Sequence, residues 1–245
     1  MYQQIELSLL RRFDPLALTS LARDRALYYA CKRLIDVVTA AILLALAAPL
    51  MLLIALLIFL DSGWPVIFAQ ERVGALHWNH SGYAYWQRTL FTCYKFRTMI
   101  RNADPSLHQA FVKAFVHGNV EPCDKTHSQF KLTNDPRVTC FGRLLRKSSL
   151  DELPQLINVL KGEMSMVGPR PVPQYEVAEY KSWHFERLAA IPGLTGLWQI
   201  NGRCQVSFDE MAKMDIEYVR HPSLWLDIKI MLLTVPAVLS GRGAE

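Results

Sequence analysis

The sequence has few cysteines and no cysteine pair at the spacing of a redox or metal-binding motif. Its five cysteines are scattered over 245 residues, and no CxxC motif occurs. Internal repeats and low-complexity tracts are also absent. A disordered chain and a disulfide-stapled mini-protein are therefore excluded, and a reducing cytoplasmic environment is expected. With 51% hydrophobic residues, the chain can form one large domain or two modest ones.

Charged residues are also scarce, at 20% of the chain, and their balance is basic. The 27 Lys and Arg residues against 22 Asp and Glu residues give a net charge of +5. A basic balance favours nucleic acid, an anionic lipid surface or a phosphorylated substrate as partner. No basic block runs along a helix or alternates with aromatic residues, so we expect no nucleic-acid partner.

The hydrophobic excess is concentrated in residues 37–60, which contain no charged side chain. As a helix rising about 1.5 Å per residue, this run is long enough for a bilayer core of about 30 Å. A purely soluble enzyme is therefore disfavoured. The 36 preceding residues carry six basic and four acidic side chains, which argues against a cleaved signal peptide. Their basic end, Arg23 to Arg33, is typical of a cytoplasmic juxtamembrane segment.

Pro49 divides this run into halves of 12 residues, and each half is about 18 Å long as a helix. Neither half could span a bilayer alone. Because proline removes a backbone donor and clashes with the preceding turn, two geometries remain open. The segment is either a kinked spanning helix or a helix that bends and returns to the same face.

A β-hairpin with a long tip is predicted after the hydrophobic run. Residues 66–68 and 89–99 have strand character, and a polar, aromatic-rich stretch at 75–88 separates them. In the second strand Lys95 and Arg97 alternate onto one face, about 7 Å apart. Two such cations suit a diphosphate, although a solvated strand face is the alternative.

Residues 101–130 form the least structured stretch by pattern. They contain three histidines and a cysteine, namely His108, His117, Cys123 and His127. Their spacing matches neither a helical i,i+4 pair nor a zinc knuckle, so a transition-metal site is disfavoured.

The densest chemistry lies between residues 133 and 173. Basic residues lead into an adjacent acid pair, Asp151 and Glu152. Ser149 and Glu152 have capping-box spacing, and Asp151 is the alternative N-cap. The bland interpretation is that both acids complement a helix dipole. The helix that follows is expected to turn four apolar residues inward: Leu153, Leu156, Ile157 and Leu160.

With the acid pair, the neighbouring arginines and the preceding hydrophobic run taken together, the chain resembles the bacterial sugar transferase family, the small monotopic phosphoglycosyl transferases. The blocks that carry the resemblance occur in family order over about residues 30–240. They are residues 32–36 (KRLID), 94–99 (YKFRTM), 150–155 (LDELPQ), 158–162 (NVLKG), 164–171 (MSMVGPRP) and 196–203 (GLWQINGR).

The resemblance implies a predominantly helical α+β protein on the cytoplasmic face of the bacterial inner membrane, in contact with membrane phospholipid. Residues 1–31 would form an N-terminal cytoplasmic segment, 32–61 a re-entrant helix broken at Pro49, and 62–245 a catalytic domain with a small hairpin and interfacial amphipathic helices. The family often carries Ser-Pro at the break, whereas Ala48-Pro49 stands here. Ala48 lacks the serine hydroxyl that could hydrogen-bond the backbone carbonyl left without a partner by the proline.

The implied reaction moves a sugar-1-phosphate from a UDP-sugar to undecaprenyl phosphate and releases UMP, with Mg²⁺ required. This reaction is the first membrane step of exopolysaccharide, capsule or O-antigen assembly. By resemblance, Asp151 is the nucleophile that forms a covalent phospho-sugar intermediate, and Glu152 helps Asp151 to hold Mg²⁺. An ionised carboxylate needs no general base, which agrees with this role.

Further site residues follow from the same resemblance and from the basic charges. The cations expected to bind substrate phosphate are Lys95, Arg97, Arg146 and Arg170. Gln199 and Arg203 are expected near the nucleotide-sugar, and Asp215 is a weaker candidate for a supporting carboxylate.

Segments 75–88 and 101–130 are longer than the minimal family core, and we expect them to contact substrate, membrane or a second subunit. Residues 224–239 form an apolar segment interrupted by Asp227 and Lys229. Trp225 in this segment suits the headgroup level of a membrane, whereas a helix packed into the core is the alternative.

Two other classes of function stay open at this point. A membrane-bound glycosyltransferase that forms a glycosidic bond would need a similar basic site with carboxylates. A non-enzymatic scaffold of a polysaccharide assembly complex is the other. The sequence does not identify the sugar, for which glucose or galactose is favoured over an acetamido sugar, and it leaves a homodimer open.

Overall fold

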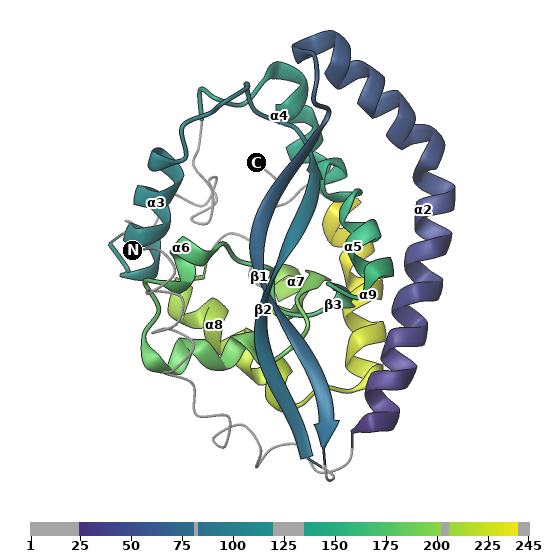
Figure 1. The fold of residues 1–245 in the computed structure, drawn as a ribbon, viewed down its shortest axis with the longest axis vertical. Helices are drawn as coiled ribbons and strands as arrows, with labels where there is room; N and C mark the ends of the chain where they lie inside the picture. Colours follow the sequence, from purple (N-terminus) through teal and green to yellow (C-terminus); the bar gives the residue numbers. More distant parts are fainter. Residues whose placement is uncertain (1–24, 81–82, 120–134, 202–205, 240–245) are drawn as a thin grey trace.

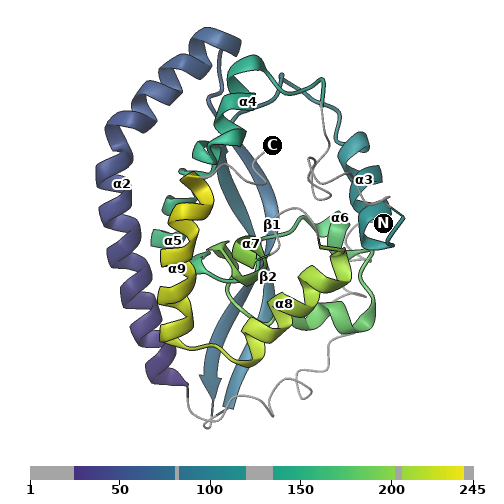
Figure 2. The same cartoon turned by 180° about the vertical axis from the view of Figure 1, so that it is seen from behind.

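The computed structural model describes residues 25–80, 83–119, 135–201 and 206–239. It confirms a mostly helical chain with a small hairpin sheet and one long apolar helix near the N-terminus. In Figures 1 and 2, α2 runs along one side, the hairpin crosses the middle, and α3 and α6 lie on the opposite side. The elements in chain order are α2 (Ala26–Ser62), β1 (Ile67–His80), β2 (Tyr83–Phe96), α3 (Ser106–Val116), α4 (Cys140–Lys147), η3 (Leu150–Glu152), α5 (Gln155–Lys161), β3 (Ser165–Val167), α6 (Gln174–Val177), η4 (Ser182–Leu188), β4 (Gly193–Thr195), α7 (Leu197–Asn201), α8 (Phe208–Arg220) and α9 (Leu224–Leu239).

Helix α2 is 37 residues long and continues through Pro49. The break that the resemblance implies at Pro49 is therefore not confirmed. One proline removes a single backbone hydrogen bond, and a helix can bend there without ending. Figure 1 shows that α2 is curved, with its C-terminal part arching toward α4. By length and composition α2 could cross a membrane.

The N-terminal half of α2 is tied to the rest of the chain by polar contacts. Lys32 forms an ion pair with Asp227 of α9 at 3.1 Å. Arg33 donates to the Val159 and Leu160 carbonyls in the last turn of α5, at 2.5 and 2.7 Å. The Asp36 carboxylate accepts a hydrogen bond from the backbone N–H of Met166 in β3, at 2.9 Å. The KRLID block therefore joins α2 to α5, β3 and α9.

The C-terminal half of α2 packs against the same body of the protein by apolar contact. Ile54 and Ile58 are 2% and 1% exposed. They lie in one cluster with Val66, Phe96 and Leu145, which come from the start of the hairpin, its end and α4. Both halves of α2 therefore contact one folded unit.

Strands β1 and β2 form an antiparallel hairpin of 14 residues each, with His80 opposite Tyr83. The hairpin prediction is confirmed, but the long tip at residues 75–88 is wrong, since this stretch continues both strands. Its aromatic residues favour strands, which outweighs its polar character. The ring of His77, far along the hairpin, lies 4.1 Å from that of Tyr29 at the start of α2.

The expectation that residues 101–130 lack structure is wrong in part, because α3 forms within them. Val112, Phe115 and Val116 are buried on one face of α3, and this 3.6-residue spacing drives the helix against α6 and α8. His108 and His117 lie on α3 and at its end. Cys123 and His127 lie outside the described residues.

Strands β3 and β4 form a short parallel pair at the centre of the molecule. A Cβ atom at Gly193 would lie 2.0 Å from the backbone nitrogen of Gly168, so this crossing requires glycine. Apolar clusters surround it between α3, α6 and α8, and between α2, α5 and α9. In α5 Leu156 is buried as predicted, whereas Ile157 is 38% exposed.

Candidate active site

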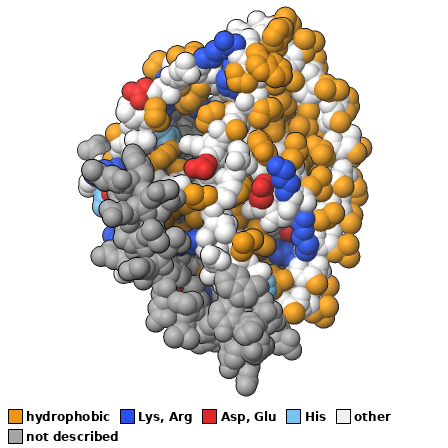
Figure 3. Space-filling view, viewed as in Figure 1, with side chains coloured by type: hydrophobic (Ala, Val, Ile, Leu, Met, Phe, Trp, Pro, Cys, Tyr) orange, Lys and Arg blue, Asp and Glu red, His pale blue; other side chains and the backbone are white. Residues whose placement is uncertain are grey.

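A cavity of about 1690 Å³ lies between the apolar helices α2 and α9, the hairpin end, η3, α3 and α6. Figure 3 shows hydrophobic side chains concentrated on the side of the molecule along which α2 runs. The cavity wall carries more cations than acids, which suits phosphate groups. Its charged residues are Arg72, Lys95, Arg97, Arg101, Arg137, Arg146 and Arg170, with Asp135, Asp151, Glu152 and Glu176.

The acid pair lies in the short 3₁₀ helix η3, which precedes α5. Ser149 before it has a φ of 58° and its side chain caps no helix N–H, so the predicted capping box is wrong. Asp151 is not the N-cap of α5 either, because Pro154 holds that position. Asp151 is buried, at 9% exposure, and lines the cavity. Asp151 is therefore part of the cavity wall.

Glu152 is held by two cations. Its Oε1 accepts Lys95 Nζ at 2.7 Å and Arg170 Nη2 at 3.0 Å. Burial would lower the pKa of Arg170, but the charge and hydrogen bond of Glu152 raise it above its ordinary value. The structure thus joins β2, η3 and the loop after β3 through three residues that the sequence assigns to the site.

Arg146 of α4 lies close to Asp151. Its Nε donates to Thr98 Oγ1 at 2.9 Å, which fixes the guanidinium on the cavity wall. Burial lowers the pKa of Arg146, and the charge of Asp151 is the largest effect opposing this shift. The charge of Arg146 therefore acts on Asp151, whereas Glu152 accepts directly from two other cations.

Arg97 has different partners from Lys95. Its Nη2 donates to Ser62 Oγ at 2.7 Å and to the Gly63 carbonyl at 2.6 Å, at the end of α2. The two cations therefore do not form a pair on one strand face, since β2 ends at Phe96. Both still line the cavity.

Gln199 of α7 lines the cavity and is 9% exposed. Its Nε2 lies 3.4 Å from the Leu194 carbonyl, which it bonds weakly. Arg203, the second residue predicted to lie near the nucleotide-sugar, is outside the described residues.

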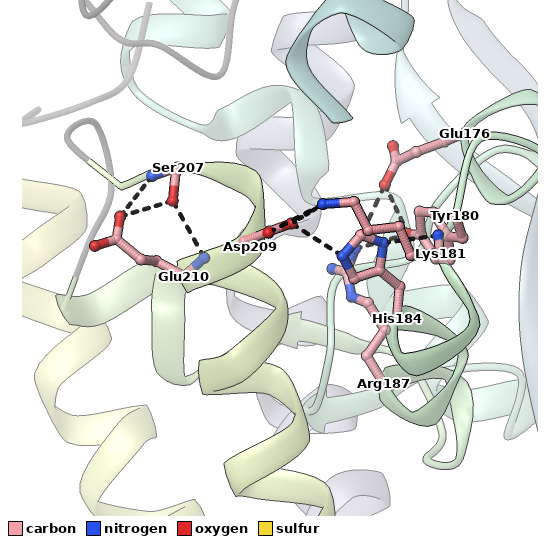
Figure 4. A network of polar contacts seen from close by, with 8 residues as sticks. All are labelled: Glu176, Tyr180, Lys181, His184, Arg187, Ser207, Asp209 and Glu210. Carbon is pink, nitrogen blue, oxygen red and sulfur yellow. Dashed lines mark hydrogen bonds and ion pairs between the residues drawn. The ribbon is translucent and has the colours of Figure 1, made fainter. Parts of the chain in front are cut away.

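Asp215 does not line the cavity, and its supporting role in the site stays a prediction. It accepts Arg187 Nη2 at 2.6 Å, and both side chains are 1% exposed. Burial raises the pKa of Asp215 to about 6, although Arg187 opposes the shift. Arg187 also donates to Tyr180, beside Glu176 (Figure 4). This buried ion pair joins α8 to η4 and α6.

The sequence missed a polar pair on the far cavity wall. His108 of α3 and Tyr175 of α6 line the cavity, and Tyr175 Oη lies 2.7 Å from His108 Nδ1. Arg72 also lines it and donates to the Pro171 carbonyl at 3.2 Å. No local pattern marks these residues, because only the fold brings α3 against α6.

The acid pair offers a partial set of ligands for Mg²⁺. Within the described ranges, no group of three or more His, Cys, Asp or Glu side chains could hold a metal ion. Mg²⁺ is commonly bound by one or two carboxylates together with substrate phosphates. Asp151 and Glu152 fit that pattern, although Glu152 Oε1 already accepts two cationic donors.

Comparison with known proteins agrees with these features. The family model described as bacterial sugar transferase matches residues 27–241. The exopolysaccharide production protein ExoY of Rhizobium meliloti (strain 1021) is 43% identical over 213 residues, which are 87% of each chain.

Two further relatives carry the names of phosphotransferases. The undecaprenyl-phosphate galactose phosphotransferase of Salmonella typhimurium is 41% identical over 87% of this chain and 41% of its own length. The undecaprenyl-phosphate glucose phosphotransferase of Komagataeibacter xylinus is 37% identical over 95% of this chain and 41% of its own. This chain thus spans less than half of either protein. With the family model matched over most of its length, the chain belongs to the bacterial sugar transferase family.

Proposed function

We propose that this protein transfers a sugar-1-phosphate from a UDP-sugar to undecaprenyl phosphate and releases UMP. The observation that carries the proposal is the buried Asp151 in the wall of a cationic cavity, which Arg146 also lines and which apolar helices wall on one side. Such a cavity suits a diphosphate and a lipid together. The names of the Salmonella and Komagataeibacter relatives support the same donor group and acceptor.

The transfer takes place in two displacement steps at one phosphorus atom. An Asp151 carboxylate oxygen attacks the phosphorus attached to the sugar, the bond to the bridging oxygen breaks, and UMP leaves with that oxygen. A phosphate oxygen of undecaprenyl phosphate then attacks the same phosphorus, and the carboxylate leaves as Asp151. Atoms and charges balance, and no oxidant or reductant is needed.

The surrounding charges allow an anion to approach an anion. Lys95 and Arg170 offset the charge of Glu152, so the neighbouring carboxylate does not add repulsion at Asp151. Arg146 lies beside Asp151 and can bind an oxygen of the transferred phosphoryl group. Arg97 lines the cavity nearer the end of α2, where a lipid phosphate would arrive.

Mg²⁺ is part of the proposal, held by Asp151 and Glu152 together with the diphosphate of the donor. When bound, it supplies a Lewis acid that neutralises charge on the phosphate oxygens. Removal of Mg²⁺ with EDTA should stop UMP release, and added Mg²⁺ should restore it. Turnover that continues at full rate in EDTA would remove the metal from the proposal.

The membrane geometry we propose is re-entrant, with both ends of α2 on the cytoplasmic face. Both halves of α2 contact one folded unit, and a spanning helix would separate them by a bilayer. The lipid-facing surface is formed by residues that the protein leaves exposed: Leu43, Leu46, Leu50, Leu52, Leu53, Leu56, Leu57, Phe59 and Leu60 of α2, with Trp225, Leu232, Leu233 and Val235 of α9. This arrangement suits the inner membrane and its phospholipid.

For the sugar we propose a hexose, glucose or galactose, in the first membrane step of exopolysaccharide, capsule or O-antigen assembly. The names of the Salmonella and Komagataeibacter relatives favour galactose and glucose, and the name of the Rhizobium relative favours exopolysaccharide production. A homodimer at the membrane surface is compatible with it.

The experiment is a UMP-release assay with undecaprenyl phosphate, Mg²⁺ and a panel of UDP-sugars. We expect UDP-glucose or UDP-galactose to react fastest. Asp151→Asn should lower turnover by at least about 10³-fold, because it removes the nucleophile. Asp209→Asn is the matched control, since Asp209 is a half-exposed carboxylate paired with Lys181 and His184. Full turnover of purified Asp151→Asn would contradict the mechanism.

A further inference from the structure

The two ends of the cavity differ in chemistry. One end is walled by α2 and α9, with apolar side chains such as Leu46 and Val235. The other end is walled by α3 and α6, and Figures 1 and 2 place these helices on the side of the molecule opposite α2. The lipid acceptor would bind at the apolar end. The water-soluble part of the donor would then bind at the end walled by α3 and α6.

Helix α3 turns one face to the cavity. His108, Phe111, Val112 and Phe115 have the i, i+3, i+4 and i+7 spacing of a single helix face, and all four line the cavity. This wall is apolar and aromatic around one imidazole. Such walls with a few fixed polar groups are typical of sites for bases and other ring ligands.

His108 is held in place by Tyr175, whose hydroxyl lies 2.7 Å from Nδ1. Burial lowers the pKa of His108 to about 4, with further lowering by Arg72, Arg137 and Arg146, so the ring is neutral at physiological pH. Burial also raises the pKa of Tyr175, which keeps its proton. With that proton donated to Nδ1, the hydrogen of a neutral imidazole is on Nε2. Nε2 has no hydrogen-bond partner among the described residues.

The cations of the cavity connect His108 to the acid pair. Arg146 acts electrostatically on Asp151 and on His108. Asp151 of η3, Arg146 of α4 and His108 of α3 line one cavity. A nucleoside diphosphate likewise carries phosphates at one end and a ribose and base at the other.

We propose that His108, oriented by Tyr175, donates a hydrogen bond from Nε2 to the nucleoside of the sugar donor, against the apolar face of α3. The accepting group is a base carbonyl or a ribose hydroxyl. The proposal rests on the proposed function, since it assigns one end of the same cavity to the UDP half of the donor. His108 is a binding residue for the donor and takes no part in recognition of the lipid.

The experiment measures KM for the UDP-sugar and for undecaprenyl phosphate separately, with the full chain in detergent micelles. His108→Ala should raise KM for the UDP-sugar about tenfold, the equivalent of one hydrogen bond of roughly 1.4 kcal/mol. KM for undecaprenyl phosphate should change less than about twofold. His108→Gln should recover most of the loss, since its amide can donate from a similar position.

His117→Ala is the matched control. His117 ends the same helix, but its Nε2 pairs with Glu179 at 2.8 Å and it does not line the cavity. This variant should keep both KM values. The proposal is overturned if His108→Ala leaves KM for the UDP-sugar unchanged or raises both KM values equally. It is also overturned if His108→Gln is as impaired as His108→Ala.

Calorimetric binding of the UDP-sugar separates this proposal from the proposed function. In the Asp151→Asn background the donor is not consumed, and the added His108→Ala should weaken its binding about tenfold. If the wild-type chain binds the UDP-sugar through His108 but releases no UMP, only the proposed function fails. If UMP is released and His108 has no effect on donor binding, only this inference fails.

Discussion

At the scale of single residues, two adjacent carboxylates have different surroundings. Asp151 lies beside Arg146, whereas Glu152 binds Lys95 and Arg170 through one oxygen. The sequence predicts that these residues share a site, and the structure brings them together. It could not predict which cation holds which acid, because that depends on how β2 and η3 meet.

Glu152→Gln should lower UMP release by at least about 100-fold. The amide removes the charge that holds Lys95 and Arg170, and both cations then compete for phosphate or repel each other. Glu186→Gln is the control, since it removes a similar pair with Arg220 at the surface. Turnover and thermal midpoint should be measured for both variants. Unchanged turnover in Glu152→Gln would show that the acid pair does not act as a unit.

Asp215→Asn should affect stability and leave substrate KM values within about twofold. It leaves the Arg187 guanidinium, 1% exposed, without its nearest anion, which costs about 3 kcal/mol or more. Urea unfolding in micelles would measure the loss, with Asp209→Asn as a control at a half-exposed position. A selective change in substrate KM without loss of stability would instead show that Asp215 supports substrate binding.

At the scale of elements, local pattern predicts α2, the existence of the hairpin and the existence of α5. It does not predict which face of α5 is buried, since Ile157 is exposed and Val159 is buried. It does not predict the length of the hairpin or helix α3. Both depend on tertiary contact: the far part of the hairpin stacks on Tyr29 of α2, and α3 packs its Val112 and Phe115 against α6 and α8. The capping-box prediction fails because Ser149 has a left-handed backbone and Pro154 delays the start of α5.

Gly193→Ala should destabilise the fold by about 3 kcal/mol or more. The new methyl group would meet the backbone of Gly168 at 2.0 Å, and neither strand of the β3–β4 pair can move without displacing the loop that carries Arg170. Gly118→Ala is the control, because no atom lies within 4 Å there and only its φ of 72° adds about 1 kcal/mol. Equal unfolding free energies for both variants would contradict this packing.

At the scale of the whole molecule, apolar residues of α2 and the acid pair line the same cavity. Contacts at both ends of α2 would hold the acid pair at a fixed depth relative to the lipid headgroups. The sequence predicts membrane attachment from residues 37–60. It leaves the path of the helix open, because Pro49 is compatible with both a kink and a return.

Cysteine labelling tests that path. In a cysteine-free background, Leu27→Cys and Trp64→Cys place single thiols at exposed positions near the two ends of α2, where the native side chains are 78% and 66% exposed. A re-entrant helix predicts that a membrane-impermeant maleimide labels both thiols only in inverted vesicles. Labelling of the two thiols from opposite sides would establish a spanning helix.

The most direct test of the central claim follows the phosphate attached to the sugar. With a UDP-sugar labelled at its β-phosphate, the account predicts that the label passes to undecaprenyl phosphate while unlabelled UMP is released. Without acceptor, the label should become bound to the wild-type protein and not to Asp151→Asn. A label that stays in released UDP would show that a glycosidic bond is formed, and it would contradict the account.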